Sequence, residues 1–349
     1  MIVIMNQLQD YNPSGIGEVN GNLFGLPHDY ESANLIVFGV PWEVTVSYGA
    51  GTANGPQQVL DASTQLDLFD FDHPDGWKQG IFMAEIPQDI LDKNKFYRSE
   101  AAKIIDRLAT GESLTATPDL TPVLREINEA GQQVNEWLFA QCQQAMQNGK
   151  RVAVIGGDHS SPLGYYQALA VKYASYGILH IDAHADLRDA YEGFEFSHAS
   201  IMFNAMKLPQ ITKLVQVGLR DICHDEVQMI DQSNGRIVGY YDPVIKQRLY
   251  SGMTWLDLCR EIVSLLPEFV YISFDVDGLD PKLCSSTGTP VPGGLELEQT
   301  YMLFREVVNS GRKIIGFDLC EVGDAEWDGN VGARIVYKLA NLMDLSQLR

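Results

Sequence analysis

Three short polar runs contain two histidines and five aspartates, and each run follows a stretch of apolar residues with the character of a β-strand. They are Gly-Gly-Asp-His-Ser at 156–160, Asp-Ala-His-Ala-Asp at 182–186 and Ser-Phe-Asp-Val-Asp-Gly at 273–278. The polar groups therefore fall where the chain leaves a buried sheet. Because ligands of open α/β sheets collect at the carboxyl ends of the strands, we predict that the three runs meet and form a metal site.

The spacing within the runs favours convergence of the side chains. Alternate residues of a strand face the same way, so Asp182, His184 and Asp186 are expected to point together. Asp275 and Asp277 repeat this spacing. The two runs therefore each aim a set of ligand atoms in one direction.

The donor types indicate how many metal ions the site holds. With His159 added, the set has two imidazoles and four carboxylates, which are too many for one tetrahedral ion and suit two ions bridged by hydroxide. Without metal, such a cluster would repel itself. The set has no thiolate and mostly carboxylate oxygens, so it favours Mn(II), keeps Ni(II), Co(II) and Fe(II) as alternatives, and argues against structural zinc.

Each run has a structural alternative. A single Asp-x-Asp is commonly a solvated turn or a helix cap, and Gly-Gly-Asp is an ordinary strand exit, but three such runs in one chain are more specific. His180 lies inside an apolar strand, so we interpret it as a core residue or one that supports the ligands. His28, His73 and His224 are expected to be surface or loop residues.

Hydrophobic patterning predicts the elements that position these runs. Strands are expected at 35–40, 80–83, 152–156, 177–182, 213–218, 236–240, 268–275 and 313–318, and helices near 56–64, 98–107, 122–149, 161–174, 254–266, 296–310 and 331–344. Strands and helices alternate without a polar linker, which predicts an α/β fold with three α/β/α layers and a mostly parallel central sheet. We expect an N-terminal extension over 1–33 and one catalytic domain over 34–349.

Composition narrows the setting. With 25 basic and 46 acidic side chains the formal net charge is −21, which disfavours nucleic acid and anionic membrane as partners and is compatible with cationic substrates. The five cysteines form no Cys-x-x-Cys pair, which is typical of reduced, cytoplasmic thiols. The apolar start of the chain lacks a basic region, and no run of about 18 apolar residues occurs, so neither secretion nor membrane spanning is expected.

In order along the chain, these and further motifs resemble the ureohydrolases, the family of arginase, agmatinase, guanidinobutyrase, formiminoglutamase and guanidine hydrolase. The resemblance rests on Gly39-Val40-Pro41, Thr45, Gly51, Gly55 and Pro56, the three metal runs, Thr287-Gly288-Thr289-Pro290 with Gly293-Gly294, and Glu321. It implies an arginase-like fold and a homo-oligomer, commonly a trimer or hexamer. It also implies two manganese ions bound by His159, Asp182, His184, Asp186, Asp275 and Asp277.

The resemblance also implies a mechanism, in which a metal-bridging hydroxide attacks the amidine carbon. Asp186 orients the hydroxide, Glu321 holds the guanidinium group, and His198 shuttles protons. The chemistry agrees, because a carboxylate suits a planar, fork-like cation and an imidazole with a pKa of about 6.5 suits a leaving amine. Without the resemblance, we would interpret Glu321 as an exposed acidic residue in a loop and His198 as a loop residue with no catalytic role.

The substrate is the least determined part. The resemblance places Arg188 where arginine-cleaving members have an asparagine, and Arg188 is expected either to bind a substrate carboxylate or to pair internally with Asp189, Glu192 or Glu195. Thr289 is counted with the substrate-binding residues. A bulky loop at 191–196 would suit a small substrate such as guanidine.

We predict hydrolysis of a linear amidine, namely an arginine-, agmatine- or guanidine-type compound that releases urea. The alternatives are formiminoglutamate hydrolysis to formamide and glutamate, and a catalytically silent member that binds metal or a partner.

Overall fold

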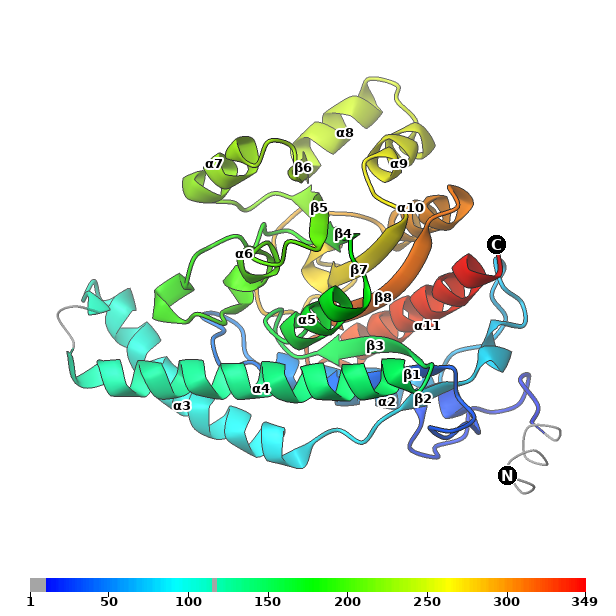
Figure 1. Ribbon diagram of the computed structural model, residues 1–349, viewed down its shortest axis with the longest axis horizontal. Helices are drawn as coiled ribbons and strands as arrows, with labels where there is room; N and C mark the ends of the chain where they lie inside the picture. Colours follow the sequence, from blue (N-terminus) through cyan, green and yellow to red (C-terminus); the bar gives the residue numbers. More distant parts are fainter. Residues whose placement is uncertain (1–10, 115–117) are drawn as a thin grey trace.

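Eight parallel strands form one central sheet in the order β2-β1-β3-β8-β7-β4-β5-β6 (Figure 1). The computed structural model describes residues 11–114 and 118–349, so the first ten residues of the extension and residues 115–117 lie outside the described part. The strands are β1 (Leu35–Val40), β2 (Ile81–Met83), β3 (Arg151–Gly156), β4 (Tyr176–Ile181), β5 (Ile211–Leu219), β6 (Ile237–Tyr241), β7 (Phe269–Asp275) and β8 (Lys313–Cys320). Every pair of neighbouring strands is parallel.

Helices cover both faces of this sheet (Figure 1). They are α2 (Gly55–Ser63), α3 (Gln88–Ala109), α4 (Thr121–Gln147), α5 (Leu163–Lys172), α6 (Ile201–Ala205), α7 (His224–Gln232), α8 (Asp242–Tyr250), α9 (Trp255–Ser264), α10 (Leu297–Asn309) and α11 (Glu326–Leu348). In β1, Leu35 and Val37 belong to the core shared with α2, α9, α10 and α11, whereas Ile36 and Phe38 belong to the core shared with α3, α4 and α5. The predicted three-layer α/β/α fold is confirmed.

The helix predicted near 98–107 was wrong in extent, because α3 begins at Gln88 and runs for 22 residues. Its first half is rich in charged residues and buries only Ile90 and Asn94, so the apolar pattern there is weak. Helices α6, α7 and α8 were not predicted. They have five to nine residues, and α8 buries only Asp242 and Ile245, which leaves little periodic signal.

The described part of the N-terminal extension packs into the fold. Leu23, Phe24 and Leu26 are buried in the same core as β1, and Asn22 donates to Ile81 O at 2.9 Å and accepts from Met83 N at 2.9 Å. These contacts attach the extension to the edge strand β2. The boundary at residue 33 and the single domain that follows remain our proposal.

Histidines outside the polar runs lie mostly as predicted. His224 is exposed at the start of α7, and His73 lies in a loop with its Nε2 atom 2.8 Å from Asp344 Oδ2. His28 also lies in a loop, as expected, although it is only 6% exposed. Its ring packs beside Gly80, which has no side chain to occupy that space.

No helix within the described ranges has both the length and the apolar character needed to cross a membrane.

Candidate metal centre

The three polar runs and Glu321 follow four strands that are neighbours in the sheet, β3, β8, β7 and β4. His159 comes after β3, Glu321 after β8, Asp275 ends β7 and Asp182 follows β4. All four side chains are buried. The sheet therefore brings the three runs together at its carboxyl edge, as the sequence predicts.

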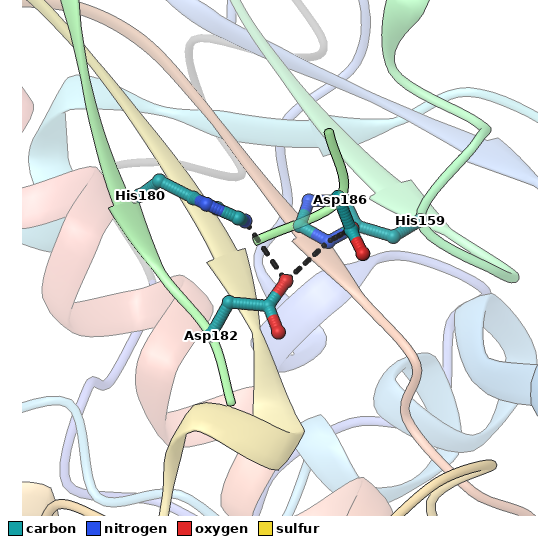
Figure 2. Close-up of side chains that lie close together, drawn as sticks. All are labelled: His159, His180, Asp182 and Asp186. Atoms are coloured by element: carbon teal, nitrogen blue, oxygen red, sulfur yellow. Dashed lines mark hydrogen bonds and ion pairs between the residues drawn. The ribbon is translucent and has the colours of Figure 1, made fainter. Parts of the chain in front are cut away.

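The first group of ligand atoms surrounds the Nδ1 atom of His159. Asp182 Oδ2 lies 3.1 Å from it, Asp275 Oδ2 3.2 Å and Asp186 Oδ2 3.4 Å. Figure 2 shows the side chains of His159, Asp182 and Asp186 turned toward one another. Ligands at about 2.1 Å from an octahedral cation are separated by about 3 Å along each edge, so these spacings fit a divalent ion.

The second group surrounds the Nδ1 atom of His184. Asp277 Oδ2 lies 3.0 Å from it and Asp182 Oδ1 lies 3.5 Å from it. Asp182 thus turns one oxygen to each group. Two groups that share a carboxylate fit the predicted pair of metal ions, and the ligand set remains the one proposed from the sequence.

The expectation that strand alternation aligns these side chains was wrong. β4 ends at Ile181, and Asp186 adopts a left-handed backbone with φ 54°. Asp277 lies in a 3-10 turn, where its amide donates to Asp275 Oδ1 at 2.8 Å. The residues converge because turns after the strands redirect them, and the left-handed residue carries backbone strain of the kind found at functional sites.

His180 supports the centre, in agreement with the sequence interpretation. Gln216 donates through Nε2 to His180 Nδ1 at 2.9 Å, so the proton of the ring resides on Nε2. That Nε2 atom lies 2.9 Å from Asp182 Oδ2 (Figure 2). Burial lowers the pKa of His180, which keeps the ring neutral.

Three acidic side chains at the centre, Asp186, Asp275 and Glu321, have raised pKa values. Burial, with a smaller contribution from the charge of Asp182, raises the pKa of Asp186 to about 7. Burial also raises the pKa of Asp275 and Glu321, and neighbouring carboxylates add to both increases. Divalent cations would stabilise the charged forms and reverse these shifts, so the electrostatics also fit a metal centre.

A cavity of about 160 Å³ opens above the two groups. Its lining residues are Ser47, His159, His184, Asp186, Arg188, Tyr191, His198, Ala199, Asp221, Glu226, Asp275, Thr289 and Glu321. Glu321 has a left-handed backbone with φ 62°, fixed by a 2.7 Å hydrogen bond from its amide to Gly157 O. Thr289 donates to Asp277 Oδ2 at 3.3 Å, so it contacts a proposed ligand as well as the cavity.

His198 lies in the cavity wall at the start of a short 3-10 turn, His198–Ser200. Its amide donates to Thr45 Oγ1 at 3.2 Å, and the same hydroxyl lies 3.4 Å from His198 Nδ1. Burial lowers the pKa of His198 to about 4, with a smaller contribution from the charge of His184. The ordinary value of about 6.5 assumed from the sequence therefore does not describe this ring without substrate.

Arg188 also lines the cavity, with its guanidinium 4.7 Å from the ring centre of Tyr191. Its ion-pair partner is Glu226, with Nε 3.9 Å from Oε2, and not one of the acids at 189, 192 and 195 that the sequence suggested. Glu226 lies in the first turn of α7, a helix that was not predicted. Its buried carboxylate accepts the amides of Leu187 and Cys223, each at 3.0 Å.

Sequence reasoning assigned no role to four further cavity or wall residues: Thr45, Ser47, Asp221 and Glu226. Tyr191 belongs to the bulky loop that was expected beside the pocket, and it does line the cavity. Thr45 was noted only as part of a motif. Its position before the Gly-rich loop was the one available signal.

The fold and the paired His/Asp groups define an α/β protein with a candidate centre for two metal ions. A model of the arginase family matches residues 33–341, and the chain belongs to that family. The resemblance seen in the motifs is thereby confirmed, and the chain is a hydrolase of the class that acts on C–N bonds in linear amidines.

Individual relatives are named as ureohydrolases, in agreement with the family match. An N(1)-aminopropylagmatine ureohydrolase of Synechocystis is 27% identical over 91% of this chain and 92% of its own length. The enzyme of the same name from Thermococcus kodakarensis is 31% identical over 84% of this chain and 83% of its own. Among solved structures, the agmatine ureohydrolase of Thermoplasma volcanium has a TM-score of 0.69 at 20% identity, covering 99% of both chains, and shows the same fold.

Proposed function

We propose that the protein hydrolyses a guanidino compound to urea and an amine or ammonia, using two divalent metal ions. The observation that carries this proposal is the Oε2 atom of Glu321, which is buried in the cavity wall and has no hydrogen-bond partner among the described residues. A buried carboxylate oxygen of this kind needs a donor, and a guanidinium group supplies planar N–H donors with a positive charge. The shared-carboxylate arrangement beneath it supports two ions.

The ligands would be His159, Asp182, His184, Asp186, Asp275 and Asp277. We propose Mn(II) as the resident metal, with Ni(II) as the alternative, because carboxylate oxygens dominate the set. When bound, two such ions lower the pKa of water toward neutrality and so provide a nucleophile.

The residues of the chain position and protonate the reactants. Glu321 orients the guanidinium group, Asp186 accepts a hydrogen bond from the nucleophile, and His198 delivers a proton to the leaving nitrogen. The low pKa of the His198 ring favours release of that proton once the ring has taken it up. Thr289 and Arg188 are proposed to contact the substrate.

The names of the relatives favour an extended cationic substrate such as agmatine or aminopropylagmatine. Asp221 and Glu226, which line the cavity, would suit the amino end of such a substrate. Arg188 instead favours a carboxylate, so formiminoglutamate remains the second candidate. The presence of all six ligands together with Glu321 argues against the silent alternative. We also propose a cytoplasmic homo-oligomer, a trimer or hexamer.

The direct test is product release after separate loading with Mn(II) and Ni(II). Urea and ammonia would be measured from guanidine, arginine, agmatine, aminopropylagmatine, guanidinobutyrate and guanidinopropionate, and formamide from formiminoglutamate. Metal-dependent urea release supports the proposal. Formamide release alone supports the second candidate, and no turnover with two ions bound contradicts both.

A further inference from the structure

A buried hydrogen-bond network lies on the edge of the His159 ring opposite the metal centre. His159 Nε2 is 2.8 Å from Ser273 Oγ, and Ser273 Oγ donates to Asp318 Oδ1 at 3.1 Å. Tyr166 donates its hydroxyl to Asp318 Oδ2 at 3.1 Å and also lies 2.8 Å from Ser273 Oγ. These residues come from β7, β8 and α5, so three elements meet behind one proposed ligand.

Asp318 is the anchor of this network. It is fully buried, and its Oδ1 atom also accepts the amide of Phe274 at 3.2 Å. Within the described part of the chain, the ion-pair contact of this carboxylate is with His159 Nε2, at 3.6 Å. Ser273 and Tyr166 are the donors in these two hydrogen bonds, so their hydroxyl protons point toward the Asp318 carboxylate.

This direction of donation determines the tautomer of His159. Because Ser273 gives its proton to Asp318, its oxygen accepts from His159 Nε2. The Nε2–H tautomer leaves a lone pair on Nδ1, the atom that faces Asp182 and Asp275. The other tautomer would direct an N–H toward these carboxylates and leave no lone pair for a metal ion.

We propose that Tyr166 and Asp318 are positioning residues that act through Ser273 to hold His159 in its metal-binding tautomer. The proposal rests on the proposed function only in requiring a divalent ion at this centre. Partners of this kind fix the ring orientation of ligand histidines, and their loss typically costs about 10- to 100-fold in metal affinity.

The chain offers a closely matched control. Tyr165 precedes Tyr166 on α5, is equally buried, and donates its hydroxyl to Val152 O at 2.8 Å, outside this network. Tyr165→Phe and Tyr166→Phe each remove one buried hydroxyl and keep the ring. Asp318→Asn goes further, because its amide can donate to Ser273 and turn the serine proton toward His159 Nε2.

The measurement is calorimetric titration of the metal-free full chain with Mn²⁺. In Tyr166→Phe and Asp318→Asn we expect one of the two ions to bind about 10- to 100-fold more weakly, with the larger loss in Asp318→Asn and wild-type binding in Tyr165→Phe. Histidine ¹⁵N shifts of the metal-free chains should show His159 Nε2 protonated in the wild type and unprotonated in Asp318→Asn. Thermal unfolding of each metal-free variant separates misfolding from weaker binding.

Wild-type affinity in both network variants, or an equal loss in Tyr165→Phe, would overturn the proposal. A wild-type chain that binds no divalent ion would overturn it together with the proposed function. The titration contains no substrate, so it tests the positioning role separately from turnover. If the variants show the expected metal affinities but the wild type turns over no guanidino compound, the positioning role is supported and the proposed function is contradicted.

Discussion

Glu321 accepts the backbone amide of His159 through Oε1 at 3.0 Å, while its Oε2 atom, also buried, has no hydrogen-bond partner within residues 11–114 and 118–349. The first contact connects the ends of β3 and β8 and fixes the carboxylate against a proposed metal ligand. The second oxygen remains available to a ligand in the cavity. An acid held rigidly with one unsatisfied oxygen is preorganised for a cation, because binding then requires little rearrangement of the protein.

Glu321→Gln tests this role. The substitution keeps the shape and removes the charge, so we expect kcat/KM for the best guanidino substrate to fall at least about 30-fold, the equivalent of about 2 kcal/mol for losing one partner of a buried charge pair. Metal content should stay at two ions per chain. Urea release and elemental analysis of the same preparations would show both effects, and Glu326→Gln, at an exposed acid nearby, should change neither. Unchanged kcat/KM would remove Glu321 from substrate binding.

Replacement of a ligand in the second group should remove metal and activity together. His184 Nδ1 and Asp277 Oδ2 lie 3.0 Å apart and are proposed to bind the same metal ion. His184→Ala and Asp277→Ala each remove one of these two donor atoms, so that ion should bind more weakly. We expect dialysed protein to retain at most one ion per chain and to release no urea. The exposed His224 serves as the control, because His224→Ala should keep both ions and full activity. Two firmly bound ions in His184→Ala would contradict the ligand assignment.

Arg188→Ala should change the choice of substrate without changing metal content. The arginine lies on Tyr191 and 3.9 Å from Glu226, so its removal takes a positive charge from the cavity and frees the Glu226 carboxylate. We expect kcat/KM to rise for agmatine relative to guanidinobutyrate. The cationic amino end of agmatine could then pair with the freed Glu226, whereas the carboxylate of guanidinobutyrate loses Arg188 as a partner. The ratio of the two values is the measurement. A constant ratio would show that Arg188 serves only the internal ion pair.

The central sheet was predictable because strands buried on both faces are nearly continuous apolar runs. The stretch from Gly177 to Ile181 indicated β4 within one residue, and the polar residues after it marked the carboxyl edge. Helix α3 was harder to find, since its charged first half buries few side chains. Local pattern thus located the elements that bury most apolar surface and missed those that bury little.

Residue types and strand ends were enough to predict which residues form the candidate site, but not the contacts that orient them. The turn that places Asp186 beside His159 depends on a left-handed residue, which no local rule for aspartate requires. Glu226 reaches Arg188 from a distant helix because β4 and β5 are adjacent, and Tyr166 reaches Asp318 because α5 packs on β8. Contacts of this kind are set by strand order and packing and leave no trace in sequence spacing.

The buried His28 predicts a pH-dependent stability. Burial lowers the pKa of this ring below its usual 6.5, with a smaller opposing effect from Asp29. As the pH falls through about 6.5, the unfolded chain gains a proton that the folded chain does not, so the free energy of unfolding decreases until the folded pKa is reached. The contribution of neutral, buried His28 to the free energy of unfolding is therefore present above pH 6.5 and is lost as the pH falls below it.

Urea unfolding of the metal-free protein between about pH 5 and pH 8 measures this effect. His28→Gln, which cannot titrate, should show a smaller decrease over this range than the wild type, whereas His224→Gln at an exposed position should follow the wild type. Parallel curves for His28→Gln and the wild type would assign the pH dependence to other groups.

The hydrogen bonds of Asn22 predict that the N-terminal extension contributes to the stability of the fold. Its side-chain amide donates to Leu26 O at 3.0 Å and to Ile81 O at 2.9 Å, and its carbonyl oxygen accepts from Met83 N at 2.9 Å. In Asn22→Ala these buried backbone groups lose their partner, so we expect the free energy of unfolding to fall by about 2–3 kcal/mol. Asn20→Ala, in the same loop but bonded to Leu26 O at 3.1 Å and to the amide of Asn22, is the milder comparison and should cost about 1 kcal/mol or less. Equal, small losses in the two variants would show that the extension can detach from β2 without weakening the domain.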